Sequence, residues 1–182
     1  MGTLIVGIIF WALPHWFKRL LPNFRKSLGQ TGRIGVALAV LVSVVLMIIG
    51  YRSATVITVW SPPTFFIHFN SLLMLLAFAV FAVSHTKGRF KGALRHPMLH
   101  SVQIWAVAHL LVKGDLVSII LFGFMLLWAT GSILLINRAE VWSRPAPGDK
   151  PKDILFIGVT ITSFLVVAAL HAFFGVWPFP VS

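Results

Sequence analysis

Three of the chain's seven histidines lie in one short stretch, RHPMLHSVQIWAVAHLLVKGD, which runs from Arg95 to Asp115. The rest of this stretch is apolar enough for a lipid bilayer, where an ionisable side chain is costly and usually turns inward to pair or to bind a ligand. The chain has no cysteine, which excludes iron–sulfur clusters, zinc thiolate sites and thiol nucleophiles. Any metal chemistry must therefore rest on histidine and the few carboxylates.

The spacing of these histidines divides them between two faces of one helix. His96 and His100 are four residues apart and share a face, whereas His100 and His109 are nine apart and point in opposite directions. His109 shares its stripe with Trp105. Like His109, His171 has apolar residues on both sides. For each histidine the alternative to ligand binding is a hydrogen bond to a neighbouring helix. This alternative is enough to explain the histidines that lie near the ends of apolar segments.

The elements that must position these side chains are membrane helices. The chain is 58% hydrophobic and only 10% charged, a composition outside the range of soluble domains. A helix needs about 20 apolar residues to cross the hydrocarbon core. The sequence predicts one all-α domain over residues 1–182, a polytopic transmembrane bundle of about six helices, with spans near 2–21, 34–50, 64–85, 97–112, 116–137 and 154–176.

The positive charges predict how this bundle sits in a membrane. The loops after the first, third and fifth spans carry five, four and four Lys or Arg residues, whereas the other side carries only Arg52 and Lys113. Because basic loops stay in the cytoplasm, thirteen against two predicts a multi-pass protein of a bacterial inner membrane with both termini in the periplasm. Charges clustered between apolar runs indicate contact with the lipid bilayer, and we expect no nucleic-acid binding.

Counting the helical rise from the loops gives each histidine a depth. His15 lies toward the cytoplasmic side, whereas His109 and His171 lie toward the outer side. His15 and His109 differ in depth by about 13 Å at 1.5 Å per residue. His171 matches the depth of His109 better. A shallow turn at VKGD or a kink at Pro14 would reduce the difference in depth between His15 and His109.

Several stretches of the chain resemble the NnrU family of integral membrane proteins, which is associated in bacteria with nitrite and nitric oxide reduction. They are PHWFKRLLPNFR, VWSPPTFFIHFNSLLMLLAF, LRHPMLHSVQIWAVAHLLVKGDLVSIILFGFMLLWA and LHAFFGVWPFP, and they extend over nearly the whole length. The family is related to a domain of plant 15-cis-zeta-carotene isomerases that binds haem b through two histidines. Carried over to the matching positions of this chain, the resemblance implies that His15 and His109 are the haem ligands. Ala106 stands where those isomerases have a cysteine, so ligand exchange and isomerase activity do not carry over.

A second resemblance concerns the RHPM stretch alone. Membrane methyltransferases of the isoprenylcysteine and phospholipid type have a similar motif, in which the arginine and the histidine help to hold S-adenosylmethionine. Arg95 and His96 would take these roles here. The later acidic and aromatic signature of those enzymes is absent, because the following loop offers only Glu140 and Tyr51 is the only tyrosine in the chain. The local explanation is a headgroup contact before a helix that starts at Pro97.

These observations predict an NnrU-like membrane protein with haem b that supports denitrification. The iron ligands are expected among His109, His15 and His171, with His109 first, and His96, Arg95 and Trp105 complete the candidate cofactor-binding residues. The alternatives are a haem-free accessory protein for nitrite or nitric oxide reductase components and, less favoured, a membrane methyltransferase. The chain shows no catalytic constellation, so whether it is an enzyme is left open.

Overall fold

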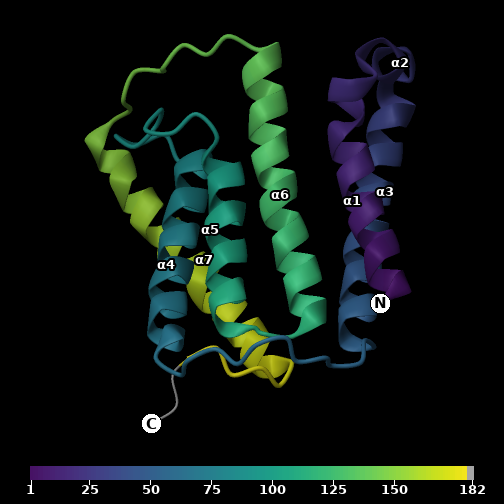
Figure 1. Cartoon of the computed structure of the whole chain (residues 1–182). Helices are drawn as coiled ribbons and strands as arrows, with labels where there is room; N and C mark the ends of the chain where they lie inside the picture. The colour runs from purple at the N-terminus through teal and green to yellow at the C-terminus, as the bar shows by residue number, and fades with distance from the viewer. Residues whose placement is uncertain (180–182) are drawn as a thin grey trace.

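The computed structural model describes residues 1–179, which are mostly helical (Figure 1). The described part contains no strand, and its one isolated bridge pairs Thr58 with Asp115. The predicted all-α class is therefore confirmed. The elements are α1 (Gly2–Leu20), α2 (Pro22–Ser27), α3 (Gly29–Arg52), α4 (Phe66–His85), α5 (Pro97–Val112), α6 (Leu116–Ala139), the 3₁₀ turn η1 (Lys150–Lys152) and α7 (Asp153–Phe173).

Each of the six predicted apolar segments forms a helix, and α5 has the predicted bounds. The largest difference is at α3, which begins at Gly29 rather than at residue 34 and so includes the polar start GQTGR. Hydropathy marks only the part of a helix that suits hydrocarbon, and a helix can continue beyond it. For the same reason the short polar helix α2 was not predicted.

Several helices are suited to a lipid environment. By length and composition α3, α4, α6 and the segment Lys150–Phe173 can each cross a membrane, whereas α5 has 16 residues and is shorter. Large apolar side chains point outward on these helices, for example Leu41, Leu72 and Leu127 with exposed fractions of 62%, 65% and 71%. Such side chains would be costly in water. The chain is a multi-pass helical membrane protein.

The helices form two groups that meet at α6. Helix α1 packs along α3, and α4 packs with α5 and α7. Helix α6 lies between the groups, packed on α5 and also on α1, as Figure 1 shows. Within the described residues α1 and α5 make no direct backbone approach. A buried cluster of Ala12, Ala106, Phe122, Trp128 and their neighbours joins α1, α5 and α6 through side chains.

The two ends of the bundle differ in charge. Met1, residues 53–65, residues 113–115 and Phe179 lie at one end, which we call the outer end (Figure 1). The loops after α1, α4 and α6 lie at the opposite end, and thirteen of the fifteen Lys and Arg residues belong to these loops or to the helix turns beside them. We call this the basic end. The arrangement matches the alternation expected from the sequence.

The outer end is fastened around Gly114. Its carbonyl oxygen accepts hydrogen bonds from the backbone N–H groups of Val59 and Trp60, at 2.8 and 3.1 Å. A Cβ on Gly114 would overlap the Trp60 carbonyl, so only glycine permits this approach. Asp115 then caps α6 by accepting from the backbone N–H and the hydroxyl of Ser118. These contacts fix the end of α5, where His109 lies.

The basic end is fastened by ionic contacts between loops. Arg19 at the end of α1 forms a 2.6 Å ion pair with Glu140, just after α6. Arg95 donates to the Glu140 backbone carbonyl, also at 2.6 Å. Arg89 pairs with Asp153 at the start of α7. The Arg19 guanidinium holds the pKa of the Glu140 carboxyl below its ordinary value. The pairing is therefore complete at neutral pH and is lost as the pH falls through that lowered pKa.

Glycines permit the close approach of α1 and α3. A Cβ on Gly50 would lie 2.3 Å from the Leu4 nitrogen, and one on Gly7 would lie 2.8 Å from the Met47 nitrogen. Both neighbours are backbone atoms, which cannot move away without shifting a helix. Small residues that let backbones approach are typical of helix pairs in membranes.

We predict that Gly50→Ala destabilises the protein, because the new methyl group would push α1 away from α3. Overpacking of this kind costs about 1–3 kcal/mol. The measurement is the thermal unfolding midpoint in detergent, followed by circular dichroism. The control is Gly158→Ala on α7, where a Cβ meets nothing within 4 Å and helix propensity favours alanine. An equal or higher midpoint for Gly50→Ala would contradict this account of the packing.

Candidate functional site

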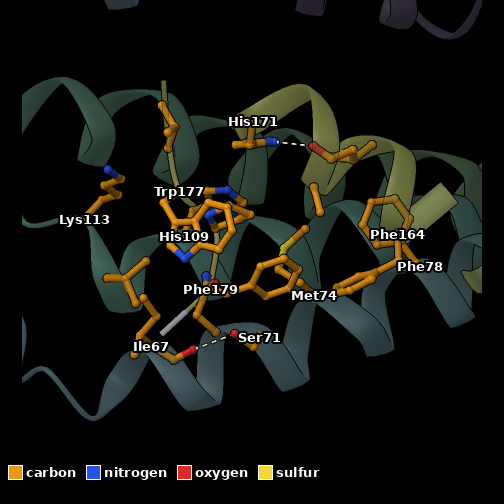
Figure 2. Close-up of a pocket in the computed structure, with 16 residues that line it drawn as sticks. Ile67, Ser71, Met74, Phe78, His109, Lys113, Phe164, His171, Trp177 and Phe179 are labelled. Carbon is orange, nitrogen blue, oxygen red and sulfur yellow. Dashed lines mark hydrogen bonds between the residues drawn. The ribbon is translucent and has the colours of Figure 1, made fainter. Parts of the chain in front are cut away.

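A cavity of about 180 Å³ lies near the outer end, between α4, α5, α7 and the segment that follows α7. Figure 2 shows side chains from all of these elements around it. The imidazoles of His109 and His171 are part of its lining, and Lys113 is the only Lys, Arg, Asp or Glu among the described lining residues. The apolar lining includes Met74, Phe78, Phe164, Trp177 and Phe179. The cavity therefore combines an apolar wall with two nitrogen donors.

His109 lies on the last turn of α5 and is held from two sides. Its Nδ1 donates a 2.9 Å hydrogen bond to the Trp105 carbonyl oxygen, one turn earlier. Its ring stacks on Phe122 of α6, with centroids 4.5 Å apart and planes 24° from parallel. Since a carbonyl can only accept, Nδ1 carries a proton, and Nε2 is the ring nitrogen left to meet a ligand. Trp105, predicted on the same stripe, packs edge-on against the same phenylalanine.

His171 is held in the same way on α7. Its Nδ1 donates to the Val167 carbonyl oxygen at 2.8 Å, the dashed line in Figure 2. Val167 and His171 both line the cavity. Neither Nε2, of His109 or of His171, has a hydrogen-bond partner among the described residues. The Nδ1 bond to a backbone carbonyl is the arrangement that orients most histidine ligands of metals.

His15 has a different environment. Its Nδ1 donates to the Trp11 carbonyl oxygen at 2.7 Å. Its ring lies against two indoles, with centroids 4.3 Å from Trp11 and 5.0 Å from Trp128. The indole N–H groups of both tryptophans are buried without a hydrogen-bond partner in the described part of the chain. The lining of the cavity does not include His15, so the structure brings His171 together with His109 and leaves His15 on the other side of α6.

Arg95 and His96 lie at the basic end, thirteen or more residues before His109 and therefore about 20 Å away along α5. His96 shares a 2.8 Å hydrogen bond, from Nε2 to Oδ1, with Asn137 near the end of α6. Together with the Arg95 contact to Glu140, this bond ties the start of α5 to the end of α6. The two residues are thus apart from the cavity.

Two polar residues of the cavity were not predicted from the sequence. Asn70 is buried on α4 and donates a 2.8 Å hydrogen bond from Nδ2 to the Ala108 carbonyl, which fixes α4 against α5 beside His109. Ser71 lines the cavity and donates to the Ile67 carbonyl. An Asn-Ser pair within an otherwise apolar span is the signal that could have found them, because buried polar groups in membranes face the bundle interior.

The chemistry available at the cavity is that of two imidazole side chains. Structural zinc sites need four ligands and catalytic ones three. The part of the chain that the structure describes holds no group of three or more His, Cys, Asp or Glu side chains placed to bind a metal ion together. Two imidazoles would be enough to hold a haem iron, since the porphyrin supplies four nitrogen ligands of its own.

Comparison with known proteins identifies the family. Residues 3–178 match the family described as NnrU protein. No curated protein and no solved structure matches the chain. The family match runs from the first turn of α1 to the segment that lines the cavity after α7, so it covers every element described above. The chain belongs to the NnrU family.

Proposed function

We propose that this protein is a b-type haem protein of the bacterial inner membrane that supports nitrite or nitric oxide reduction. The observation that carries the proposal is the meeting of His109 and His171, from two helices, at one cavity with both Nε2 atoms free. The link to denitrification rests on the family resemblance alone. A haem held by His109 and His171 would supply one-electron transfer.

The donors at the cavity suit haem. Each imidazole is fixed through Nδ1, so its Nε2 is presented without the cost of losing rotamer freedom on binding. Aromatic side chains from α4 and α7, Phe78 and Phe164, form an apolar wall suited to a porphyrin face. Lys113 on the lining at the outer end suits a propionate, because an ammonium pairs with a carboxylate.

The space at the cavity suits haem less well. Its volume of about 180 Å³ is below the roughly 300–1,000 Å³ of pockets for drug-sized ligands. Residues 176–179, including Trp177 and Phe179, contribute part of the lining (Figure 2). We therefore expect this segment to lie further from α4 and α5 in the haem-bound protein.

The same observation favours a second candidate function. A cavity of this size suits a haem-free protein, and the family then implies an accessory role in assembling nitrite or nitric oxide reductase components.

Within the haem proposal, the second histidine ligand also has an alternative. His15 is the position implied by the resemblance to plant isomerases, and reaching His109 from there requires Trp128 and Phe122 to move.

The first test is spectroscopic. Wild-type protein expressed with ample haem should show a Soret band of low-spin six-coordinate iron. His109→Ala should lose most of the bound haem, and His171→Ala should give a high-spin spectrum, because one axial imidazole is removed. His85→Ala is the control, since His85 ends α4 at the basic end and does not line the cavity.

Three results would decide against parts of this proposal. If His15→Ala rather than His171→Ala gives the high-spin spectrum, His15 is the second ligand. If His109→Ala keeps a full Soret band, the iron lies elsewhere. If wild-type protein shows no Soret band, the haem-free accessory function replaces the haem proposal.

The second test concerns sidedness. We expect Met1 and the outer end to face the periplasm, because thirteen Lys and Arg residues belong to the opposite end. Alkaline phosphatase fused after Ser182 should be active, and a green fluorescent protein at the same place should be dark. The reverse pattern would place the outer end in the cytoplasm.

The third test concerns methyl transfer. Arg95 and His96 are engaged by the end of α6, so we expect no binding of S-adenosylmethionine to the detergent-solubilised protein. Calorimetry measures this directly. A micromolar dissociation constant that is lost in Arg95→Ala, but kept in the control Arg144→Ala in the next loop, would favour a methyltransferase.

A further inference from the structure

A second hollow, an apolar groove of about 450 Å³, lies between α1 and α3 toward the basic end. Leu13, Phe17 and Leu21 line it on one side, and Gly32, Gly35 and Ala39 line it on the other. It extends over about two helical turns, from Leu21 to Leu13, or roughly 12 Å along α1. Leu13 and Leu21 are more than half exposed, so the groove opens to the lipid side of the helix pair.

Gly35 in this groove differs from the glycines at the other end of the same helix pair. At Gly7 and Gly50 a Cβ would overlap backbone atoms of the facing helix, so no larger residue fits. A Cβ on Gly35, by contrast, would meet no heavy atom within 4 Å. The backbones of α1 and α3 therefore press together around Gly7 and Gly50, whereas no described residue fills the space over Gly35.

A cation lies at the basic end of the groove. Nη1 of Arg25, on the short helix α2, lies 3.0 Å from the position of a Cβ on Gly32. This guanidinium donates to the Gly29 carbonyl at 3.3 Å and pairs with no carboxylate in the described part of the chain. The carboxylates of the basic end are engaged elsewhere: Glu140 by Arg19, Asp149 by Lys152 and Asp153 by Arg89.

We propose that this groove is a binding site for an anionic phospholipid. One acyl chain lies over Gly35, and the phosphate is held by Arg25 at the basic end. A guanidinium matches phosphate in geometry as well as in charge. A second copy of this chain fits the site less well, because each copy has a net charge of +11 and its positive charge is concentrated at this same end. The proposal is independent of the haem proposal.

Native mass spectrometry of the detergent-purified protein tests this site. Phosphatidylglycerol and phosphatidylcholine with the same acyl chains are added separately. We expect the wild type to bind one phosphatidylglycerol at least about fivefold more tightly than phosphatidylcholine, the effect of one cation near a headgroup. Arg25→Gln should remove this preference. Gly35→Leu should weaken both lipids, because the side chain fills the groove.

Matched controls separate the site from general effects. Lys91→Gln removes one exposed positive charge from another loop of the basic end, and Gly158→Leu adds the same side chain to the lipid-facing side of α7. Both should bind like the wild type. Unchanged thermal unfolding midpoints verify that Arg25→Gln and Gly35→Leu are folded.

Three outcomes would overturn the proposal. Equal affinity of the wild type for the two lipids would show that the groove has no headgroup preference. An equal loss in Arg25→Gln and Lys91→Gln would assign the preference to the overall charge of the basic end. A lipid-free dimer that Gly35→Leu abolishes would assign the groove to a second copy of the chain.

Discussion

A polar group within hydrocarbon must find its partner inside the protein, and the rest of this structure depends on that constraint. Backbone groups satisfy it by forming helices, which is why the described residues contain no sheet. Histidines satisfy it in the same local way. His15, His109 and His171 each donate from Nδ1 to the carbonyl oxygen four residues earlier. The outcome is that all three present Nε2, and only the surroundings of each ring decide what that nitrogen can do.

Those surroundings are set by α6, the helix on which both α1 and α5 pack. Phe122 stacks on His109, whereas Trp128, about 9 Å further along α6, contacts His15. The two imidazoles are thereby separated by a layer of buried side chains. On the opposite side of α5, α4 and α7 leave a cavity, and His171 enters it. The position of this central helix thus determines which two of these histidines line one cavity.

The sequence predicted the parts of this arrangement that depend on local signals. Hydropathy located six helices, and the helical rise placed His171 at the depth of His109. Depth alone could not show which histidine lies beside His109 at the cavity, because a depth does not say which helices are neighbours. That choice depends on long-range contacts such as Asn70 with the Ala108 carbonyl, which fixes α4 beside α5. Helix α2 and the start of α3 were missed because their residues are polar and lie beyond the hydrocarbon stretch.

The indole N–H groups of Trp11 on α1 and Trp128 on α6 are buried without an acceptor among the described residues. A buried donor without an acceptor costs about 1–3 kcal/mol, so two of them next to His15 are a considerable penalty. Their neighbour Trp16 avoids it by donating to the Ser132 hydroxyl at 2.9 Å. Helix α1 is also held less closely to α6 than to α3, with which it forms a pair through Gly7 and Gly50. Contacts between α1 and the end of α6 also include the ion pair of Arg19 with Glu140, so a shift of α1 against α6 would break both this pair and the Trp16–Ser132 hydrogen bond. The surroundings of His15 are therefore set by the contacts of α1 with both α3 and α6.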